Sequence, residues 1–99
     1  MTPKFRAFIK SKAHLLDPVL RIGKEGLKEE TIEAIELYLN KNEVMKIQIL
    51  NNSDITQEEL FLDISNNIRN VEFIQSIGHV LVIYKESQKK IFLDQWKNK

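Results

Sequence analysis

Apolar residues follow two different spacings along the chain, and each spacing predicts its own kind of element. Helical spacing marks the first segment, whose apolar stripe consists of Phe5, Phe8, Ile9, Ala13 and Leu16. Thr2 can cap this helix, and Pro3 is acceptable in its first turn. Asp17 and Pro18 then end it, because the residue before a proline is pushed away from helical dihedral angles.

Strands and helices alternate through the rest of the sequence. The spacing predicts strands at residues 19–22, 44–50, 71–77 and 80–84. It predicts a helix from about residue 27 to 40, and a third helix that opens with a capping box between Thr56 and Glu59. Gly78 and His79 separate the last two strands, which predicts a tight hairpin.

The resulting order, α-β-α-β-α-β-β, predicts a compact α/β domain over residues 1–85. Helices between the first three strands suggest right-handed crossovers and parallel pairs, and the closing hairpin adds an antiparallel pair. We therefore expect a four-stranded mixed sheet with helices packed on it. Residues 86–99 form a tail that is polar except for residues 91–93 and Trp96, and the pattern leaves open whether this tail docks or frays.

Length and composition exclude several classes of protein. The 99 residues, of which 42% are hydrophobic, suffice for one modest core. Because the chain has no cysteine, it holds no disulfide and no thiolate metal site. No apolar run approaches the ~20 residues that cross a bilayer, and the first residues lack the apolar stretch of a signal peptide. We expect a soluble cytoplasmic protein.

Charge is unevenly distributed, although the net charge is only +1. Residues 1–28 hold seven Lys or Arg against two acids, and residues 76–99 hold five Lys against two acids. Residues 29–75 hold ten acids against three basic residues. Such a division can simply solvate different faces. A basic region indicates nucleic-acid binding when it coincides with a backbone feature that binds phosphate.

A Gly-Lys-Glu-Gly loop at residues 23–26 supplies such a feature between the first expected strand and the second helix. Glycines let a phosphodiester approach the main chain closely, and free N–H groups of the following helix favour a phosphate. The same glycine spacing clamps backbone nucleotides in KH domains. Two glycines three apart also commonly make only a turn, but Arg21, Lys24 and Lys28 add positive charge here. Glu25 repels phosphate unless its carboxylate points away.

The sequence resembles a known family, the CRM domain of chloroplast RNA splicing and ribosome maturation, and especially its single-domain bacterial members of the YhbY type. The matching residues span nearly the whole chain: Ala13-His14, Pro18-Val19, Ile22-Gly23, Gly26-Leu27, Glu43-Val44-Met45-Lys46-Ile47, Ile77-Gly78 and Leu81-Val82-Ile83-Tyr84-Lys85. Departures are Lys28 in place of a hydroxyl cap, Lys12 in place of an apolar residue, and a longer tail.

The resemblance implies a fold similar to the C-terminal domain of translation initiation factor three. It also implies RNA binding through the glycine-bounded loop and association with ribosomal RNA in precursors of the large ribosomal subunit. The expected RNA-binding residues are Gly23, Lys24, Glu25, Gly26, Arg21, Lys28, Lys4, Lys10 and Lys12. We expect a monomer that needs no cofactor, no metal and no membrane.

Two other classes of function are alternatives to RNA binding. Neither His14 nor His79 has a partner that spacing can supply, so we expect no enzyme and in particular no small hydrolase. The acidic middle instead suggests a protein-interaction module that docks on a basic ribosomal or assembly partner. Most of the eight aromatic residues fall at apolar positions, which disfavours base stacking on a sheet face.

Overall fold

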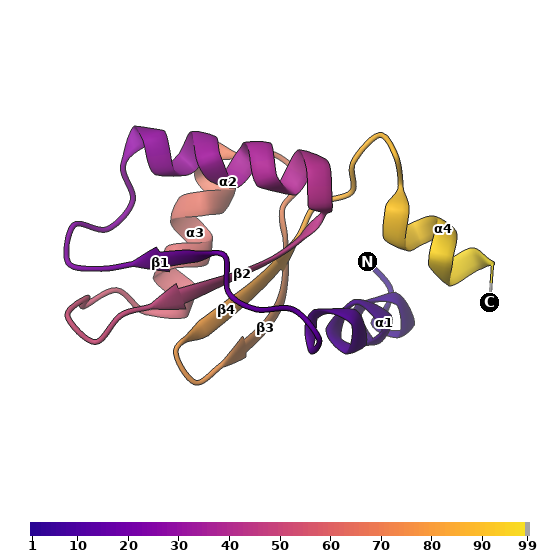
Figure 1. Cartoon of the computed structure of the whole chain (residues 1–99), viewed down its shortest axis with the longest axis horizontal. Helices are drawn as coiled ribbons and strands as arrows, with labels where there is room; N and C mark the ends of the chain where they lie inside the picture. Colours follow the sequence, from indigo (N-terminus) through magenta and orange to yellow (C-terminus); the bar gives the residue numbers. More distant parts are fainter. Residues whose placement is uncertain (99) are drawn as a thin grey trace.

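The structure, a computed structural model, describes residues 1–98 and forms three layers with a sheet in the middle. The helices are α1 (Pro3–Ala13), α2 (Glu29–Asn42), α3 (Gln57–Asn67) and α4 (Ile91–Lys97). The strands are β1 (Leu20–Ile22), β2 (Val44–Ile49), β3 (Glu72–Ile77) and β4 (Val80–Tyr84). Helices α2 and α3 pack on one face of the sheet, and α1 packs on the other with α4 beside it (Figure 1). The predicted α/β class and four-stranded mixed sheet are confirmed.

The order of the strands, β1-β2-β4-β3, departs from the sequence prediction in one respect. Strands β1 and β2 are parallel, as expected, and the β3–β4 hairpin is antiparallel. The expected parallel pair of β2 with β3 is wrong, because β4 lies between them and runs antiparallel to both. The physical reason is burial: residues 80–84 are apolar throughout and suit a central strand, whereas β3 carries exposed positions that suit an edge.

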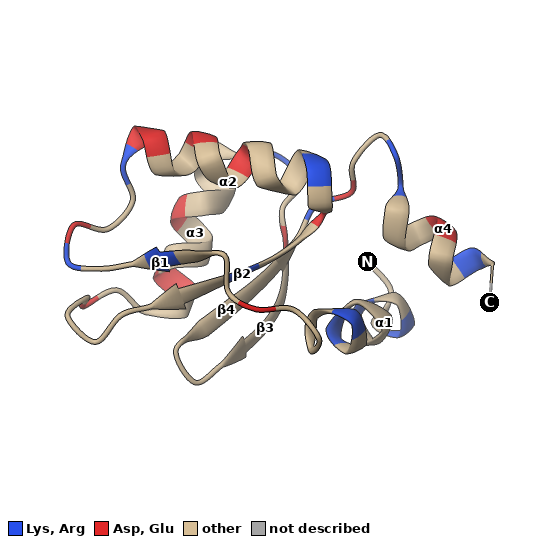
Figure 2. Ribbon diagram, viewed as in Figure 1, with Lys and Arg blue, Asp and Glu red and all other residues tan. Residues whose placement is uncertain are grey.

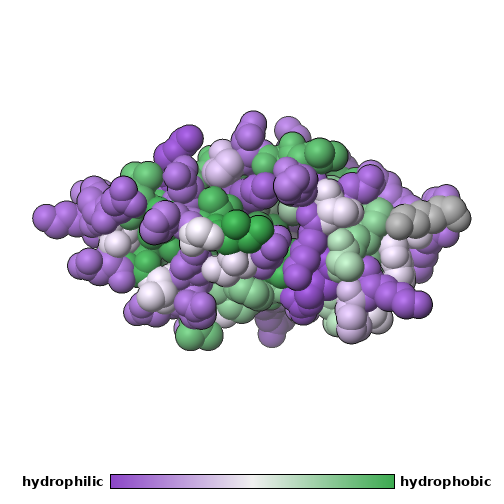
Figure 3. All heavy atoms as spheres, turned by 90° about the horizontal axis from the view of Figure 1, so that it is seen from below, coloured by the Kyte–Doolittle hydropathy of each residue, from purple (hydrophilic) through white to green (hydrophobic). Residues whose placement is uncertain are grey.

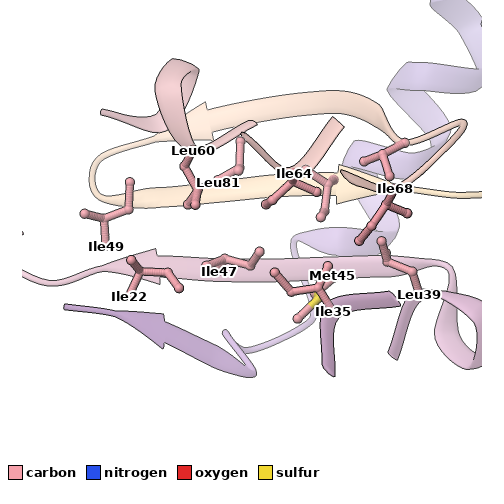
Figure 4. Packing of buried hydrophobic residues seen from close by; sticks show 12 residues of the cluster. Ile22, Ile35, Leu39, Met45, Ile47, Ile49, Leu60, Ile64, Ile68 and Leu81 are labelled. Atoms are coloured by element: carbon pink, nitrogen blue, oxygen red, sulfur yellow. The ribbon is translucent and has the colours of Figure 1, made fainter. Parts of the chain in front are cut away.

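The buried residues of the core between the sheet and the helices α2 and α3 are all aliphatic apart from one methionine, and half-buried aromatic side chains pack around them (Figure 4). Met45, Ile47 and Ile49 alternate along β2 and point into this core. They meet Ile35 and Leu39 of α2, and Leu60, Ile64 and Ile68 from α3 and its end. Most of these side chains are wholly excluded from solvent, so this face of the sheet is closed.

The second core lies between α1 and one end of the opposite sheet face. Phe5, Phe8, Ile9 and Ala13 are buried there, which confirms most of the predicted stripe. Leu16 is an exception: it is 39% exposed, because the helix ends at Ala13 and the chain turns away. The contacts include an edge-on pair of Phe5 with Tyr84, and the ammonium of Lys12 lies 5.3 Å from the centre of the Phe8 ring.

Two helix N-termini carry the capping hydrogen bonds that the sequence predicts. Thr2 accepts a hydrogen bond from the Phe5 N–H at 3.1 Å, and the predicted capping box of Thr56 with Glu59 is complete. Helix α2 is less well specified. It begins at residue 29 rather than about 27, and Lys28 at its N-cap makes no side-chain capping hydrogen bond.

A buried carboxylate fixes the segment after β4. Glu43 ends α2 with a φ of 70° and is wholly buried. Its carboxylate accepts hydrogen bonds from the Ser87 N–H at 2.8 Å and hydroxyl at 2.6 Å, and from the N–H groups of Ile91 at 3.2 Å and Phe92 at 3.1 Å. Trp96 of α4 then packs on Phe5, with ring centres 5.2 Å apart. The last residue of the tail, residue 99, lies outside the described residues.

Candidate functional site

The Gly-Lys-Glu-Gly segment at residues 23–26, here called the glycine loop, forms a closed turn at one end of the molecule (Figure 1). The N–H of Gly26 donates to the carbonyl of Gly23 at 3.1 Å, which closes the turn. At the base of the loop, the N–H of Leu50 donates to the carbonyl of Ile22 at 2.8 Å. These bonds tie the loop to the end of β2, so it projects from a rigid part of the sheet.

The two glycines serve the loop for different reasons. A Cβ on Gly23 would lie 3.3 Å from the side-chain oxygen of Asn52, because the turn after β2 approaches closely. Gly26 has open space around it but a φ of +68°, a conformation that L side chains rarely adopt. Limited space favours glycine at residue 23, and the positive φ favours glycine at residue 26. The main chain of the loop is therefore not covered by side chains at these two positions.

The carboxylate of Glu25, whose direction the sequence did not predict, forms an ion pair with Lys28. Lys28 Nζ lies 2.9 Å from a carboxylate oxygen of Glu25, and both side chains are exposed. The hydrogen bond and the charge of Lys28 lower the pKa of Glu25, and the same contacts raise the pKa of Lys28. Among the described residues, Arg21 and Lys24 form no ion pair. Glu25 is thus neutralised locally, and two positive charges are left for a ligand.

A hollow of about 320 Å³ brings most of the predicted site residues together. Its lining includes Arg21, Gly23, Lys24, Glu25, Gly26 and Lys28. Asn52 also lines it, although it was not among the predicted residues. Because β1 and β2 are parallel neighbours, the turns that follow them meet at the same edge, so the Asn51-Asn52 turn signal together with the pairing could have located this residue.

The remaining predicted residues, Lys4, Lys10 and Lys12, lie on α1 and do not join this hollow. The molecule measures 42 × 25 × 20 Å, and the glycine loop and α1 lie toward opposite ends of its long axis (Figure 2). Lys4 and Lys10 are exposed, while Lys12 is half-buried over Phe8. The basic N-terminal region of the sequence therefore forms two separate groups of charges.

The two histidines lie apart from the hollow beside the glycine loop. His14 follows the last turn of α1, where its N–H donates to the carbonyl of Lys10 at 3.0 Å, and His79 is exposed in the β3–β4 turn. No group of three metal-ligating side chains occurs in residues 1–98. Within the same range, none of the helices combines the length and apolar character that crossing a bilayer requires.

Fold and loop together define a small α/β domain that presents a basic, glycine-bounded turn at one end. The chain belongs to the CRS1 / YhbY (CRM) domain family, whose model matches residues 1–85. The resemblance inferred from the sequence is confirmed.

Named relatives match over most of their length. A protein of Bacillus subtilis named "Probable RNA-binding protein YqeI" is 32% identical over 89 residues, which cover 90% of this chain and 92% of that protein. One of Haemophilus influenzae, named "RNA-binding protein", is also 32% identical and covers 90% of this chain and 89% of its own. The solution structure of the hypothetical protein SAV1595 from Staphylococcus aureus superposes with a TM-score of 0.72 at 36% identity, covering 89% of this chain and 91% of that chain.

Proposed function

We propose that this protein binds RNA by placing a backbone phosphate in the hollow beside the glycine loop. The observation that carries the proposal is the pairing of Glu25 with Lys28, which leaves Arg21 and Lys24 unpaired among the described residues around an uncovered main chain. The names of the two bacterial relatives support RNA as the ligand.

Contact with a phosphate requires donors and an approach path. The exposed side chains of Arg21 and Lys24 supply charged donors, and Gly23 and Gly26 remove the side chains that would hold a phosphate away. The first turn of α2 lies next to the loop, but Glu29 and Glu30 already complement its dipole. We therefore assign the contact to the loop and its basic side chains rather than to the helix end.

Lysines on α1 give the RNA a second point of contact. Because Lys4, Lys10 and Lys12 lie toward the other end of the molecule, only an RNA that extends along the domain reaches both groups. All eight aromatic residues are buried or half-buried, so few rings are free for stacking. We propose that the target is a structured RNA, namely ribosomal RNA in precursors of the large subunit, bound in the cytoplasm by a monomer without cofactor or metal.

One observation favours a second candidate, the protein-interaction module. Glu29, Glu30, Glu33 and Glu36 are all exposed on α2, away from the core. A basic partner protein could bind this acidic face. Such binding would not depend on the glycine loop, and this difference separates the two proposals.

The test replaces Lys24 and Glu25 together by Asp. Both side chains are exposed, so thermal unfolding should move little, while carboxylates now occupy the place of the phosphate. We expect the affinity for a large-subunit ribosomal RNA fragment to fall about tenfold or more, and the slope of log affinity against log salt to fall by about one contact. The matched control, Lys41→Asp with Glu36→Asp, makes the same charge change on α2 and should bind normally.

The same two variants test the target in cells. The unaltered protein and the control should sediment with large-subunit precursors, and the loop variant should move to the soluble fraction. Unchanged RNA binding by a folded loop variant would remove the loop from the mechanism. Sedimentation of the unaltered protein with the small subunit would overturn the large-subunit assignment, and salt-independent binding to a basic protein would favour the acidic face.

A further inference from the structure

Helix α1 covers only part of the sheet face on which it lies. It buries Val44, Ile74, Val82 and Tyr84 toward one end of the strands. Beyond that end, toward the hairpin and the glycine loop, no described helix lies on this face. We call the uncovered part the open half-sheet; it consists of Arg21, Gln48, Lys46, Gln75, Ile77 and Val80 with Val19 at its margin.

Strand register arranges these residues in rows across the sheet. Arg21 pairs with Gln48, Gln48 pairs with Val80, and Val80 pairs with Ile77, so one row crosses all four strands. A second row contains Lys46, Val82 and Gln75, and the N–H of Val19 donates to the carbonyl of Lys46 at 3.0 Å. Paired residues point to the same side of a sheet, so these side chains share one surface.

The surface is hollowed and partly apolar. A hollow of about 420 Å³ is lined by residues that include Leu16, Lys46, Gln75, Ile77 and Val80. Ile77 is 54% exposed and Val19 46% exposed, although both are aliphatic. Seen from the side of the β3–β4 hairpin, apolar side chains reach the surface between hydrophilic ones and do not merge into one continuous patch (Figure 3). This mixture suits a ligand that is itself part apolar and part polar.

Arg21 joins the open half-sheet to the glycine loop. It lines the hollow beside the loop and also begins the first row of the sheet surface. An RNA strand whose backbone lies beside the glycine loop can therefore continue directly over the row of Arg21, Gln48 and Val80. Lys46 adds a second positive charge to this surface. Its ammonium group donates to the carbonyl of Leu16 at 2.8 Å, which holds it at the edge of the hollow.

We propose that the open half-sheet holds the unpaired bases of an RNA whose backbone is gripped by the glycine loop; the inference rests on the function proposed above. The guanidinium of Arg21 offers a plane on which a base can stack. Ile77 and Val80 offer apolar contact to the next base, and the amides of Gln48 and Gln75 can donate to and accept from base edges. The substrate class is thus structured RNA with unpaired nucleotides, not continuous duplex.

Charge favours RNA over a protein as the occupant. Arg21 and Lys46 lie within the surface, and Asp17 is the one carboxylate that lines its hollow. Gln48 lies between Arg21 and Val80 in the first row, and Gln75 lies beside Val82 in the second. A purely apolar protein surface would leave both amides without partners. An RNA strand satisfies both groups, because its phosphates meet the cations while its base edges meet the amides.

The test compares Ile77→Glu with Leu62→Glu. These residues are similarly exposed aliphatics, at 54% and 58%, but Leu62 lies on α3, on the opposite side of the sheet. The probes are an RNA hairpin with an unpaired loop and a fully paired duplex of the same base composition. We expect Ile77→Glu to weaken binding of the hairpin about tenfold, and Leu62→Glu to leave it unchanged.

A charge-neutral variant separates base contacts from repulsion of phosphate. Gln48→Ala together with Gln75→Ala should lower the preference for the unpaired RNA over the duplex by about tenfold, with little change in duplex affinity. Thermal unfolding of each variant establishes that the domain remains folded.

Three results would overturn the inference of base contacts, and a fourth would refute the proposed function itself. Equal affinities of the unaltered protein for hairpin and duplex, both still sensitive to the loop variant, would leave loop binding intact and remove the base contacts. Equal behaviour of Ile77→Glu and Leu62→Glu would do the same. If Ile77→Glu instead abolished self-association and left RNA affinity unchanged, the surface would be a protein contact. Failure of every RNA to bind would refute the proposed function itself.

Discussion

The two faces of the sheet differ in how far helices cover them. Helices α2 and α3 close one face over an aliphatic core, and the side chains of β2 that point there are buried along its whole length. On the other face, α1 and α4 cover one end and leave Arg21, Gln48 and Ile77 at the surface. We therefore expect the closed face to stabilise the fold, and the open half-sheet to accept substitutions without unfolding of the domain.

Truncation on each face gives the largest expected contrast. Ile47→Ala removes a wholly buried side chain from the closed face and should lower the free energy of unfolding by about 2–5 kcal/mol. Val80→Ala, on the half-buried surface of the same sheet, should cost less than about 1 kcal/mol. Chemical denaturation of both variants measures the difference. Equal losses would show that the open half-sheet is as important for stability as the closed face.

The link between the faces is the carboxylate of Glu43, which ends α2 and accepts hydrogen bonds from the segment that leads into α4. Glu43→Ala removes the acceptor and leaves three N–H groups without it, so we expect a loss of about 1–3 kcal/mol and early exchange of the amides of Ile91 and Phe92. Glu36→Ala, an exposed control on the same helix, should change little. Normal protection of α4 in the Glu43 variant would contradict this role.

The smallest expected effect concerns Tyr84, which lies under α1. Its hydroxyl is buried and has no hydrogen-bond partner among the described residues, so Tyr84→Phe should change stability at neutral pH by less than about 1 kcal/mol. Burial, and then the charges of Glu43 and Glu86, raise the pKa of Tyr84.

Alkaline pH should separate this variant from the unaltered protein. An unfolded tyrosine ionises near pH 10, while the folded Tyr84 keeps its proton to higher pH. The free energy of unfolding is therefore unaffected by Tyr84 ionisation below about pH 10. It falls as the pH rises further, because the tyrosine releases its proton in the unfolded chain before it does so in the folded protein. Thermal unfolding across this range should show a shallower decline for Tyr84→Phe. Parallel curves for the two proteins would refute the raised pKa.

Local signals predicted the elements well because their causes are local. Thr2, the Thr56–Glu59 pair and the apolar stripe of α1 act within a few residues, and the structure confirms them except for Leu16. The start of α2 was placed too early, since Lys28 gives no capping signal and the glycine loop occupies the residues before it. Strand order was harder, because a hairpin can join a sheet by either strand and only the burial of both its faces selects β4.

The residues of the candidate site also differ in whether the sequence alone could locate them. The residues from 21 to 28 are near one another in sequence and also in space, and most of them line one hollow. Three more basic residues lie far from that segment, namely Lys4, Lys10 and Lys12. They belong to α1, which lies toward the other end of the molecule. Asn52 and the rows of the open half-sheet depend on strand pairing, which charge and glycine spacing do not encode.

The position of Glu43 affects how sequences of this family should be compared. The family match ends at residue 85, but the described donors to the carboxylate of this buried acid come from residues 87, 91 and 92. Within the matched range alone, an acid between a helix and a strand would be interpreted as a solvated surface position. We expect a chain shortened to 85 residues to be less stable, because the carboxyl of Glu43 would lose these donors. The boundary of sequence similarity is therefore a poor guide to where the chain can be cut.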